Sequence, residues 1–255
     1  MKRLLIIGIG AGDPEHVTMQ AVRALNETDV LFVMDKGDDK ADLVQLRQEI
    51  CDRHIAGPYR MVTTPDPPRV LDGPSYEDDV RAWHQQRVTI YERLIATEIP
   101  PGGTGAFLVW GDPSLYDSTL RFVDSILARG AVAFDVEVIP GISAVQVLAA
   151  RHRIALHGVG EPVHITTGRR LASSADPLAD GDVTVMLDGG CAFASIDPTD
   201  VEIFWGAYLG TPDEILVSGP LAEVADDIVR RRAEAKAAKR WMFDTYLLRR
   251  RKPRS

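Results

Sequence analysis

Three aspartates, Asp35, Asp112 and Asp188, stand at the ends of short apolar runs. Runs of five or six apolar residues are typical of buried strands, so each carboxylate is expected close to a strand end. In an open α/β sheet, ligands bind outside the carboxyl ends of the strands. A carboxylate at that edge can accept hydrogen bonds from hydroxyl or ammonium groups. The pattern therefore predicts a small-molecule site built on strand ends.

The central stretch of the chain places Gly111, Asp112 and Pro113 directly after the apolar run 106–110. Gly111 has no Cβ, so a ligand can lie against its backbone. Pro113 has no N–H to donate to a sheet, and it favours an extended conformation at Asp112. Ser118 can then cap a following helix. An ordinary strand–turn–helix connection, with Asp112 as a turn residue, is the alternative interpretation.

A glycine-rich loop, Gly8-Ile9-Gly10-Ala11-Gly12-Asp13-Pro14, follows the first apolar run, and Thr18 can cap the next helix. The loop differs from the dinucleotide motif G-x-G-x-x-G because Asp13 replaces the third glycine, and its carboxylate would repel a pyrophosphate. The next strand nevertheless ends at Asp35, where dinucleotide-binding enzymes place an acid that holds a ribose. An NAD-type oxidoreductase therefore remains an open alternative.

The composition limits the classes of partner. The net charge is −8, yet residues 230–255 hold eleven Lys or Arg against two Asp or Glu, a local +9. The remaining −17 argues against general nucleic-acid binding, and the basic end is interpreted as a solvated terminal segment. Neither the two cysteines nor the six histidines have metal-ligand spacing, so no metal is predicted. No apolar stretch is long enough to span a membrane, and the expected compartment is the cytoplasm.

Strand and helix patterns alternate along the chain, which predicts an α/β fold with a mostly parallel first sheet. The strands expected at 203–208 and 215–218 are joined by a short connection and should be antiparallel, giving a mixed second sheet. We place the junction of the two α/β domains near 116–118. The expected domains are therefore 1–116 and 117–255, the second ending in the basic segment.

Four motifs in this order resemble the tetrapyrrole (corrin/porphyrin) methylases, the S-adenosylmethionine-dependent enzymes of sirohaem and cobalamin synthesis. The resemblance covers nearly the whole chain, and the ordered set is more specific than any single motif. Two further segments, Trp110 to Arg121 and Asp188 to Phe193, resemble the member that methylates a corrin precursor at C-1 and releases acetic acid. The four motifs are Gly8 to Pro14 with Thr18, Gly111-Asp112-Pro113, Pro140-Gly141-Ile142-Ser143-Ala144, and Gly210 to Glu214 with Gly219-Pro220-Leu221.

The resemblance implies two α/β domains with S-adenosylmethionine bound in the cleft between them, a small-molecule tetrapyrrole substrate and a homodimer. It also implies a set of cofactor contacts from both halves of the chain. These are Ala11, Gly111, Asp112, Leu115, Ser143, Ala144, Leu187, Asp188, Ala207 and Leu221.

The chain departs from many relatives at two of these positions. Ala11 replaces a common proline, and Asp188 stands where methionine is frequent. Either Asp188 puts a charge near the sulfonium, or Leu187 is the contact instead. Asp35, Asp188 and Tyr116 are candidates for assisting acetate release, and the catalytic group stays unassigned. The alternatives within the family are methylation of another corrin position, of rRNA ribose or of a modified histidine in a translation factor.

Overall fold

The computed structural model describes residues 1–35, 41–68 and 75–251. These residues form two compact units, which comprise 1–143 and 144–255 of the chain. Within the described ranges, each unit is built around a five-stranded sheet. All neighbouring strands of the first sheet are parallel, and the second sheet is mixed. The predicted fold class is confirmed.

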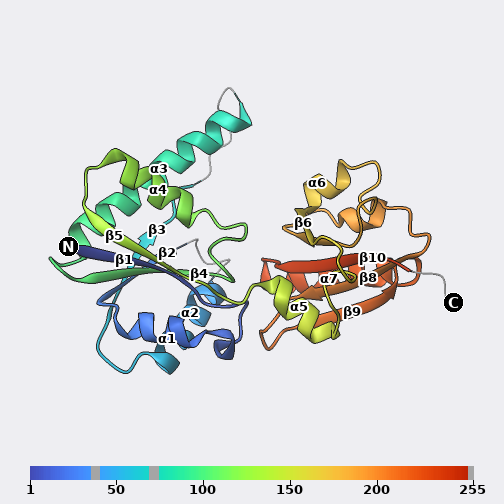
Figure 1. Ribbon diagram of the computed structural model, residues 1–255, viewed down its shortest axis with the longest axis horizontal. Helices are drawn as coiled ribbons and strands as arrows, with labels where there is room; N and C mark the ends of the chain where they lie inside the picture. The colour runs from blue at the N-terminus through green and yellow to red at the C-terminus, as the bar shows by residue number, and fades with distance from the viewer. Residues whose placement is uncertain (36–40, 69–74, 252–255) are drawn as a thin grey trace. The chain divides into compact units, whose positions relative to one another are not determined.

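The first sheet has the strand order β3-β2-β4-β1-β5. Helices α1 and α2 cover one face of this sheet, and α3 and α4 cover the other (Figure 1). The strands are β1 (Lys2–Gly8), β2 (Val30–Asp35), β3 (Arg60–Pro65), β4 (Thr104–Val109) and β5 (Phe134–Ile139). The helices are α1 (Met19–Asn26), α2 (Ala41–His54), α3 (Tyr76–Glu98), α4 (Thr119–Arg129) and the short 3₁₀ turn η1 (Pro14–His16).

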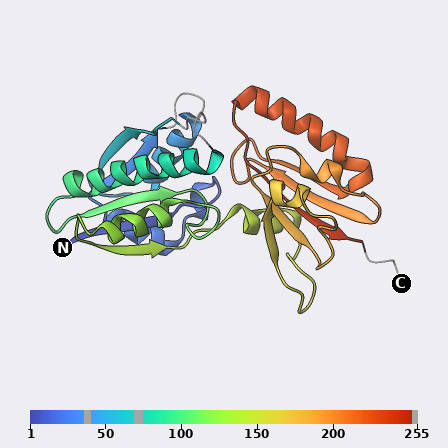
Figure 2. The ribbon, with the colours of Figure 1, turned by 90° about the horizontal axis from the view of Figure 1, so that it is seen from above.

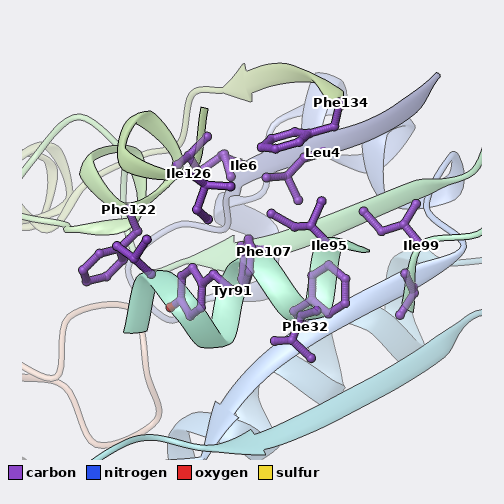
Figure 3. Close-up of a cluster of buried hydrophobic side chains, with 14 of the residues drawn as sticks. Leu4, Ile6, Phe32, Tyr91, Ile95, Ile99, Phe107, Phe122, Ile126 and Phe134 are labelled. Carbon is purple, nitrogen blue, oxygen red and sulfur yellow. The ribbon is translucent and has the colours of Figure 1, made fainter. Parts of the chain in front are cut away.

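The central strands of this sheet are buried on both faces. In β1, Leu4 packs into the cluster beneath α3 and α4, whereas Leu5 packs into the cluster beneath α1 and α2. Figure 3 shows the first of these clusters, in which the ring of Tyr91 stacks on Phe107 with centroids 4.4 Å apart. A strand covered on both sides needs apolar residues at every position. This requirement explains the continuous apolar runs in the sequence.

The second sheet has the order β6-β7-β10-β8-β9, and β10 is antiparallel to both of its neighbours. The expected antiparallel pairing of β8 with β9 is confirmed. The strands are β6 (His164–Thr167), β7 (Val183–Met186), β8 (Val201–Ala207), β9 (Ile215–Pro220) and β10 (Asp244–Arg250). The helices are α5 (Ala144–His152), α6 (Gly168–Ala172), α7 (Leu221–Lys239) and the 3₁₀ turn η3 (Ala192–Ser195).

Helices α5 and α7 pack on opposite faces of the second sheet. His152 of α5 contacts the ring of Phe204, whereas Arg232 of α7 pairs with Asp244 beside Trp205. Successive residues of a strand point to opposite faces, so Phe204 and Trp205 mark the two sides. Figure 2 shows α7 running along its face of this sheet.

The basic segment 230–255 is not the solvated end that the composition suggested. Most of its described part belongs to α7 and to β10, the central strand of the second sheet. Tyr246, Leu247 and Leu248 are fully buried. That interpretation was wrong because the charged residues flank a short apolar strand whose partners lie far away in the sequence.

The two units divide after Ser143, whereas the sequence placed the junction near 116–118. β5 follows that expected junction but pairs with β1, with Ile139 opposite Ile7. The parallel pairing returns the chain to the first sheet through α4. The boundary therefore lies in the loop after β5, and residues 117–143 belong to the first unit.

Thr18 and Ser118 were both expected to cap helices. Thr18 caps α1 as predicted, because its Oγ1 accepts a hydrogen bond from the N–H of Ala21 at 3.1 Å. Ser118 occupies the N-cap position of α4, but its side chain makes no capping hydrogen bond. The carboxylate of Asp117 takes this role and accepts a hydrogen bond from the N–H of Thr119 at 2.6 Å.

Candidate functional site

The loops that follow β4, β1 and β5 pass close to one another at three glycines. A Cβ on Gly141 would lie 2.1 Å from the carbonyl oxygen of Gly111, and a Cβ on Gly8 would lie 2.6 Å from the nitrogen of Gly141. Contacts under about 3 Å leave no room for a side chain. The loops that follow these three strands therefore pack backbone against backbone, which holds them in a fixed arrangement.

The loops after β1 and β4 are also joined by hydrogen bonds. The N–H of Gly111 donates to the carbonyl of Gly10 at 2.8 Å, and the two residues form an isolated bridge. Gly111 has φ +70°, a conformation that favours glycine. Strands β1 and β4 are neighbours in the sheet. After β1 the chain continues through α1 to β2, on one side of this pair, and after β4 it continues through α4 to β5, on the other side. Such a switch point is where ligands bind in open α/β sheets.

Asp112 links the loop after β4 to the loop after β5. One carboxylate oxygen, Oδ1, accepts hydrogen bonds from the N–H and hydroxyl of Ser114, and the other, Oδ2, accepts from the N–H of Gly141 at 2.9 Å. Partial burial acts to raise the pKa of Asp112, but the hydrogen bonds from Ser114 and Gly141 outweigh it and hold the pKa below its usual value. The ionised carboxylate is therefore part of the loop structure.

Four other predicted contacts follow the same strand ends. Ala11 lies after β1 and is 4% exposed, and Ser143 lies after β5 and is 2% exposed. Leu115 is half-buried one turn after Asp112, and its N–H donates to the carbonyl of Asp112 at 3.2 Å. Ala144 follows Ser143 directly and is the first residue of α5. The fold of the first unit thus gathers Ala11, Gly111, Asp112, Leu115 and Ser143 at one sheet edge.

Of the predicted contacts in the second unit, Leu187 and Ala207 lie at the same edge of the sheet, and Leu221 lies at the other. Because β10 is antiparallel to β7 and β8, the carboxyl ends of β7 and β8 lie at the same edge, with Leu187 and Ala207 there. Leu221 follows β9, whose last residue Pro220 pairs with Glu202 at the start of β8. Leu221 is therefore at the opposite edge, where it is 1% exposed.

At the end of β7, the two neighbouring candidates differ completely in exposure. Leu187 has φ +52° and is 58% exposed, whereas Asp188 is 4% exposed. The carboxylate of Asp188 accepts hydrogen bonds from the N–H groups of Gly190 and Ala192 and from the hydroxyl of Tyr246. The side chain presented at this strand end is that of Leu187.

The start of β10 also reaches this edge, and sequence reasoning did not include it. The N–H of Tyr208 donates to the carbonyl of Phe243 at 2.9 Å, and the hydroxyl of Tyr208 donates to the carbonyl of Trp241 at 2.7 Å. Phe243 is 40% exposed. The apolar run from Tyr246 to Leu248 could have revealed the strand, but nothing in the sequence marks its antiparallel partners.

The candidates for assisting acetate release lie in different surroundings. Asp35 is exposed at the carboxyl end of β2, and Tyr116 is 42% exposed after β4, with φ +53°. Asp188 is enclosed by its hydrogen bonds. Among the residues that the structure describes, no group of His, Cys, Asp and Glu could hold a metal ion. The helices of the same residues include none that could cross a membrane.

Comparison with known proteins decides the family. Residues 3–225 match the family of Tetrapyrrole (Corrin/Porphyrin) Methylases. The chain belongs to the tetrapyrrole methylase family. Of the curated members, the Precorrin-6A synthase [deacetylating] of Sinorhizobium is 52% identical over 250 residues, which cover 98% of this chain and 95% of that protein.

Solved structures of tetrapyrrole methylases show the same fold. A cobalamin synthesis related protein, CobF, of Corynebacterium diphtheriae superposes with a TM-score of 0.84 at 38% identity, covering 99% of this chain and 100% of that one. A uroporphyrin-III C-methyltransferase of Thermus thermophilus, complexed with S-adenosylhomocysteine, gives a TM-score of 0.59 at 21% identity, covering 96% and 91%. The second likeness bears on the fold alone.

Proposed function

We propose that this tetrapyrrole methylase transfers a methyl group from S-adenosylmethionine to C-1 of precorrin-5 and releases acetate, giving precorrin-6A. The main support is the 52% identity to a precorrin-6A synthase over nearly the full length of both chains. CobF, at 38% identity over the whole of both chains, supports a role in cobalamin synthesis. The segments Trp110 to Arg121 and Asp188 to Phe193 pointed to the same member of the family.

The first sheet suits S-adenosylmethionine better than a dinucleotide. The cofactor carries a ribose, an amino acid and a sulfonium, and no pyrophosphate. Asp13 occupies the position where a pyrophosphate-binding loop needs glycine, and its carboxylate accepts a hydrogen bond from the N–H of Glu15. A cationic donor would not be repelled by this carboxylate. The loops at the switch point are packed together at Gly8, Gly111 and Gly141.

Asp112 retains limited capacity to bind the cofactor directly. A carboxylate offers about four lone-pair sites, and the bonds from Ser114 and Gly141 occupy three of them. One site on Oδ2 can accept a hydrogen bond from a ribose hydroxyl or an ammonium group. We therefore assign Asp112 mainly to holding the loops after β4 and β5 together, with at most one bond to the donor.

Each unit contributes its own set of proposed cofactor contacts. In the first unit they are Ala11, Gly111, Asp112, Leu115 and Ser143, which share the carboxyl edge of the sheet. In the second unit they are Ala144 at the start of α5, Leu187 after β7 and Ala207 at the end of β8. Leu221 is left out because it lies at the other edge, and Asp188 is left out because its carboxylate is enclosed by hydrogen bonds within the fold.

Methyl transfer requires little of the side chains beyond binding. S-adenosylmethionine supplies an electrophilic methyl group, and an enamine-like carbon of the corrin precursor is already nucleophilic. Holding donor and acceptor in line supplies much of the acceleration, so no nucleophilic side chain is needed. Acetate release requires a water molecule to lose a proton and add to the acyl carbon. The carbon–carbon bond then breaks, the acyl group leaves as acetate, and the bonding electron pair stays on the tetrapyrrole, which also takes up the methyl group. Asp35 and Tyr116, both exposed, are the proposed groups for moving the proton of that water.

We further propose that the chain acts in the cytoplasm as a homodimer on a small-molecule substrate and does not bind nucleic acid. Ion pairs occupy many of the basic residues near its end. Arg230 and Arg231 pair with Asp227, Arg249 pairs with Asp182, and Arg250 pairs with Asp176. Paired arginines offer less charge to phosphates. Binding of RNA that weakens steeply with salt would contradict this part of the proposal.

Thermal unfolding with ligands tests the class of cofactor. A ligand at about 100 times its Kd stabilises the folded protein by about 2.7 kcal/mol. S-adenosylhomocysteine should therefore raise the melting temperature, and NAD should leave it unchanged. The opposite result would favour the oxidoreductase. Precorrin-2 and precorrin-5 offered in parallel as methyl acceptors then separate this activity from those of sibling methylases, because only precorrin-5 should be consumed.

A further inference from the structure

A buried polar network lies beneath the loop that follows β7. Tyr246 donates its hydroxyl to Oδ2 of Asp188 at 2.6 Å. Arg232 donates to the backbone carbonyl of Asp188 at 2.6 Å and to the carboxylate of Asp244 at 2.8 Å. Tyr246 is fully buried, and the three charged residues are each less than 10% exposed. The network therefore joins α7 and β10 to both the backbone and the side chain of one loop residue.

The same carboxylate organises the loop itself. Its Oδ1 accepts the N–H of Gly190 at 3.0 Å, and its Oδ2 accepts the N–H of Ala192 at 2.7 Å. On the other side, a Cβ added to Gly168 would lie 2.4 Å from Cγ of Asp188. Asp188 is thus enclosed by its own loop, by β10 and by the start of α6. It has no freedom to turn toward a ligand.

The loop held in this way has an unfavourable backbone. Leu187 and Cys191 both have positive φ, +52° and +57°. Such conformations cost about 1–3 kcal/mol for residues other than glycine and persist only when the surroundings enforce them. Leu187 is also 58% exposed, so packing of its side chain does not hold it there. Hydrogen bonds to the side chain and backbone of Asp188 tie the loop to α7 and β10.

We propose that Tyr246 and Arg232 are positioning residues that act through Asp188 to hold Leu187 in its cofactor-binding conformation. This inference rests on the proposed function, in which Leu187 contacts S-adenosylmethionine. Neither residue is expected to touch the cofactor, since Tyr246 is fully buried and Arg232 is engaged at Asp188 and Asp244. Their contribution is to keep the loop ordered before the cofactor arrives, which lowers the entropy lost on binding.

The test is Tyr246→Phe, which removes one hydroxyl and keeps the ring that packs on Phe193. We expect the Kd for S-adenosylhomocysteine, measured by calorimetry, to rise about tenfold, equivalent to about 1.4 kcal/mol. The KM for S-adenosylmethionine should rise by the same factor while kcat changes less than about twofold, since ground state and transition state lose the same interaction. In the ligand-free protein, the amides of Gly190 and Ala192 should exchange hydrogen faster.

Tyr59→Phe is the matched control. It removes a hydroxyl that bonds Gln48 and Asp52 in the first unit, just before β3. Any loss of affinity that follows from general destabilisation should appear in both variants. Unchanged affinity in Tyr246→Phe, with or without faster exchange of the two amides, would overturn the inference, because the hydroxyl would then have no effect on cofactor binding.

Leu187→Gly provides a second test of the inference, because an exposed residue can be replaced without unfolding the protein. Glycine adopts positive φ freely and carries no side chain, so we expect weaker binding of S-adenosylhomocysteine and no further loss when Tyr246→Phe is added. Additive losses in this double-mutant cycle would show that Tyr246 does not act through Leu187. An unaltered parent protein that binds no S-adenosylhomocysteine would instead overturn the proposed function, and this inference with it.

Discussion

Asp112→Asn tests whether the loops after β4 and β5 are held by a carboxylate. An asparagine oxygen can keep the two bonds from Ser114, because asparagine suits the same turn. Its NH₂ group cannot accept the N–H of Gly141, which Oδ2 of Asp112 binds at 2.9 Å. The loss is therefore one hydrogen bond to a charged acceptor, about 1.5–3 kcal/mol. For a domain of this size, that corresponds to a fall in melting temperature of about 3–12 °C.

Calorimetry and thermal unfolding of the same samples are the assays. We expect the affinity for S-adenosylhomocysteine to fall about tenfold or more, because the Gly141 loop also carries Ser143. Asp197→Asn is the matched control, since Asp197 accepts the N–H of Thr199 within its own exposed turn. Equal melting temperatures for Asp112→Asn and the parent protein would refute the reasoning, because the link to Gly141 would then contribute nothing.

The pH dependence of the same pair of proteins follows from the lowered pKa of Asp112. A carboxyl whose pKa is lower in the folded state stabilises the protein fully above its unfolded pKa, about 3.9. That contribution is lost as the pH falls through the folded pKa. The stability difference between the parent protein and Asp112→Asn should therefore be largest near neutral pH and shrink in acid. A constant difference down to pH 2 would contradict this linkage.

Three further predictions concern the glycine crossing, a buried thiol and the last strand. Gly141→Ala should destabilise the protein by about 3 kcal/mol or more in urea unfolding, since its Cβ would meet a carbonyl oxygen at 2.1 Å. Gly57 has open space around it, so the free energy of unfolding of Gly57→Ala should stay within about 0.5 kcal/mol of the parent value. Burial raises the pKa of Cys51 to about 11, so iodoacetamide at pH 8 should leave it unmodified until the protein is denatured, as peptide mass mapping would show. Truncation after Lys239 removes the central β10 and should abolish folding of the second unit in far-UV circular dichroism and solubility assays; a folded product would mean that β10 is dispensable.

Local signals in the sequence were sufficient for much of the first unit. Its strands are buried on both faces and read as continuous apolar runs, and each helix connection is long enough for a parallel crossover. Gly8, Gly111 and Gly141 follow three of these runs, so the edge of the site could be predicted from their positions. The contacts among the three glycine backbones could not be predicted, because they depend on the strand order β4-β1-β5.

The second unit was harder to predict because its sheet depends on pairings between distant residues. β10 is short, is flanked by arginines and pairs with β7 and β8, which precede it by tens of residues. Composition alone therefore assigned its residues to a solvated end. Leu221 looked similar in sequence context to the other contacts, yet the antiparallel turn of β9 carries it to the other edge.

Asp188 shows a different limit of sequence reasoning. A carboxylate at the end of a strand is compatible with binding a cation or with organising a loop, and the sequence does not distinguish these roles. The structure places donors from Gly190, Ala192 and Tyr246 around it, which leaves the carboxylate inside the fold. Of the two alternatives that the sequence left open, we therefore propose that Leu187 is the contact and that the carboxylate of Asp188 supports its loop.

The most direct measurement of the central claim follows both products of one turnover. The protein is incubated with precorrin-5 and S-adenosylmethionine carrying a ¹³C-labelled methyl group, and the products are analysed by mass spectrometry and carbon NMR. We predict one labelled methyl group at C-1 of the tetrapyrrole and one unlabelled acetate for each S-adenosylhomocysteine formed. Label at another ring position, or methylation without acetate, would contradict the assignment as a deacetylating precorrin-6A synthase.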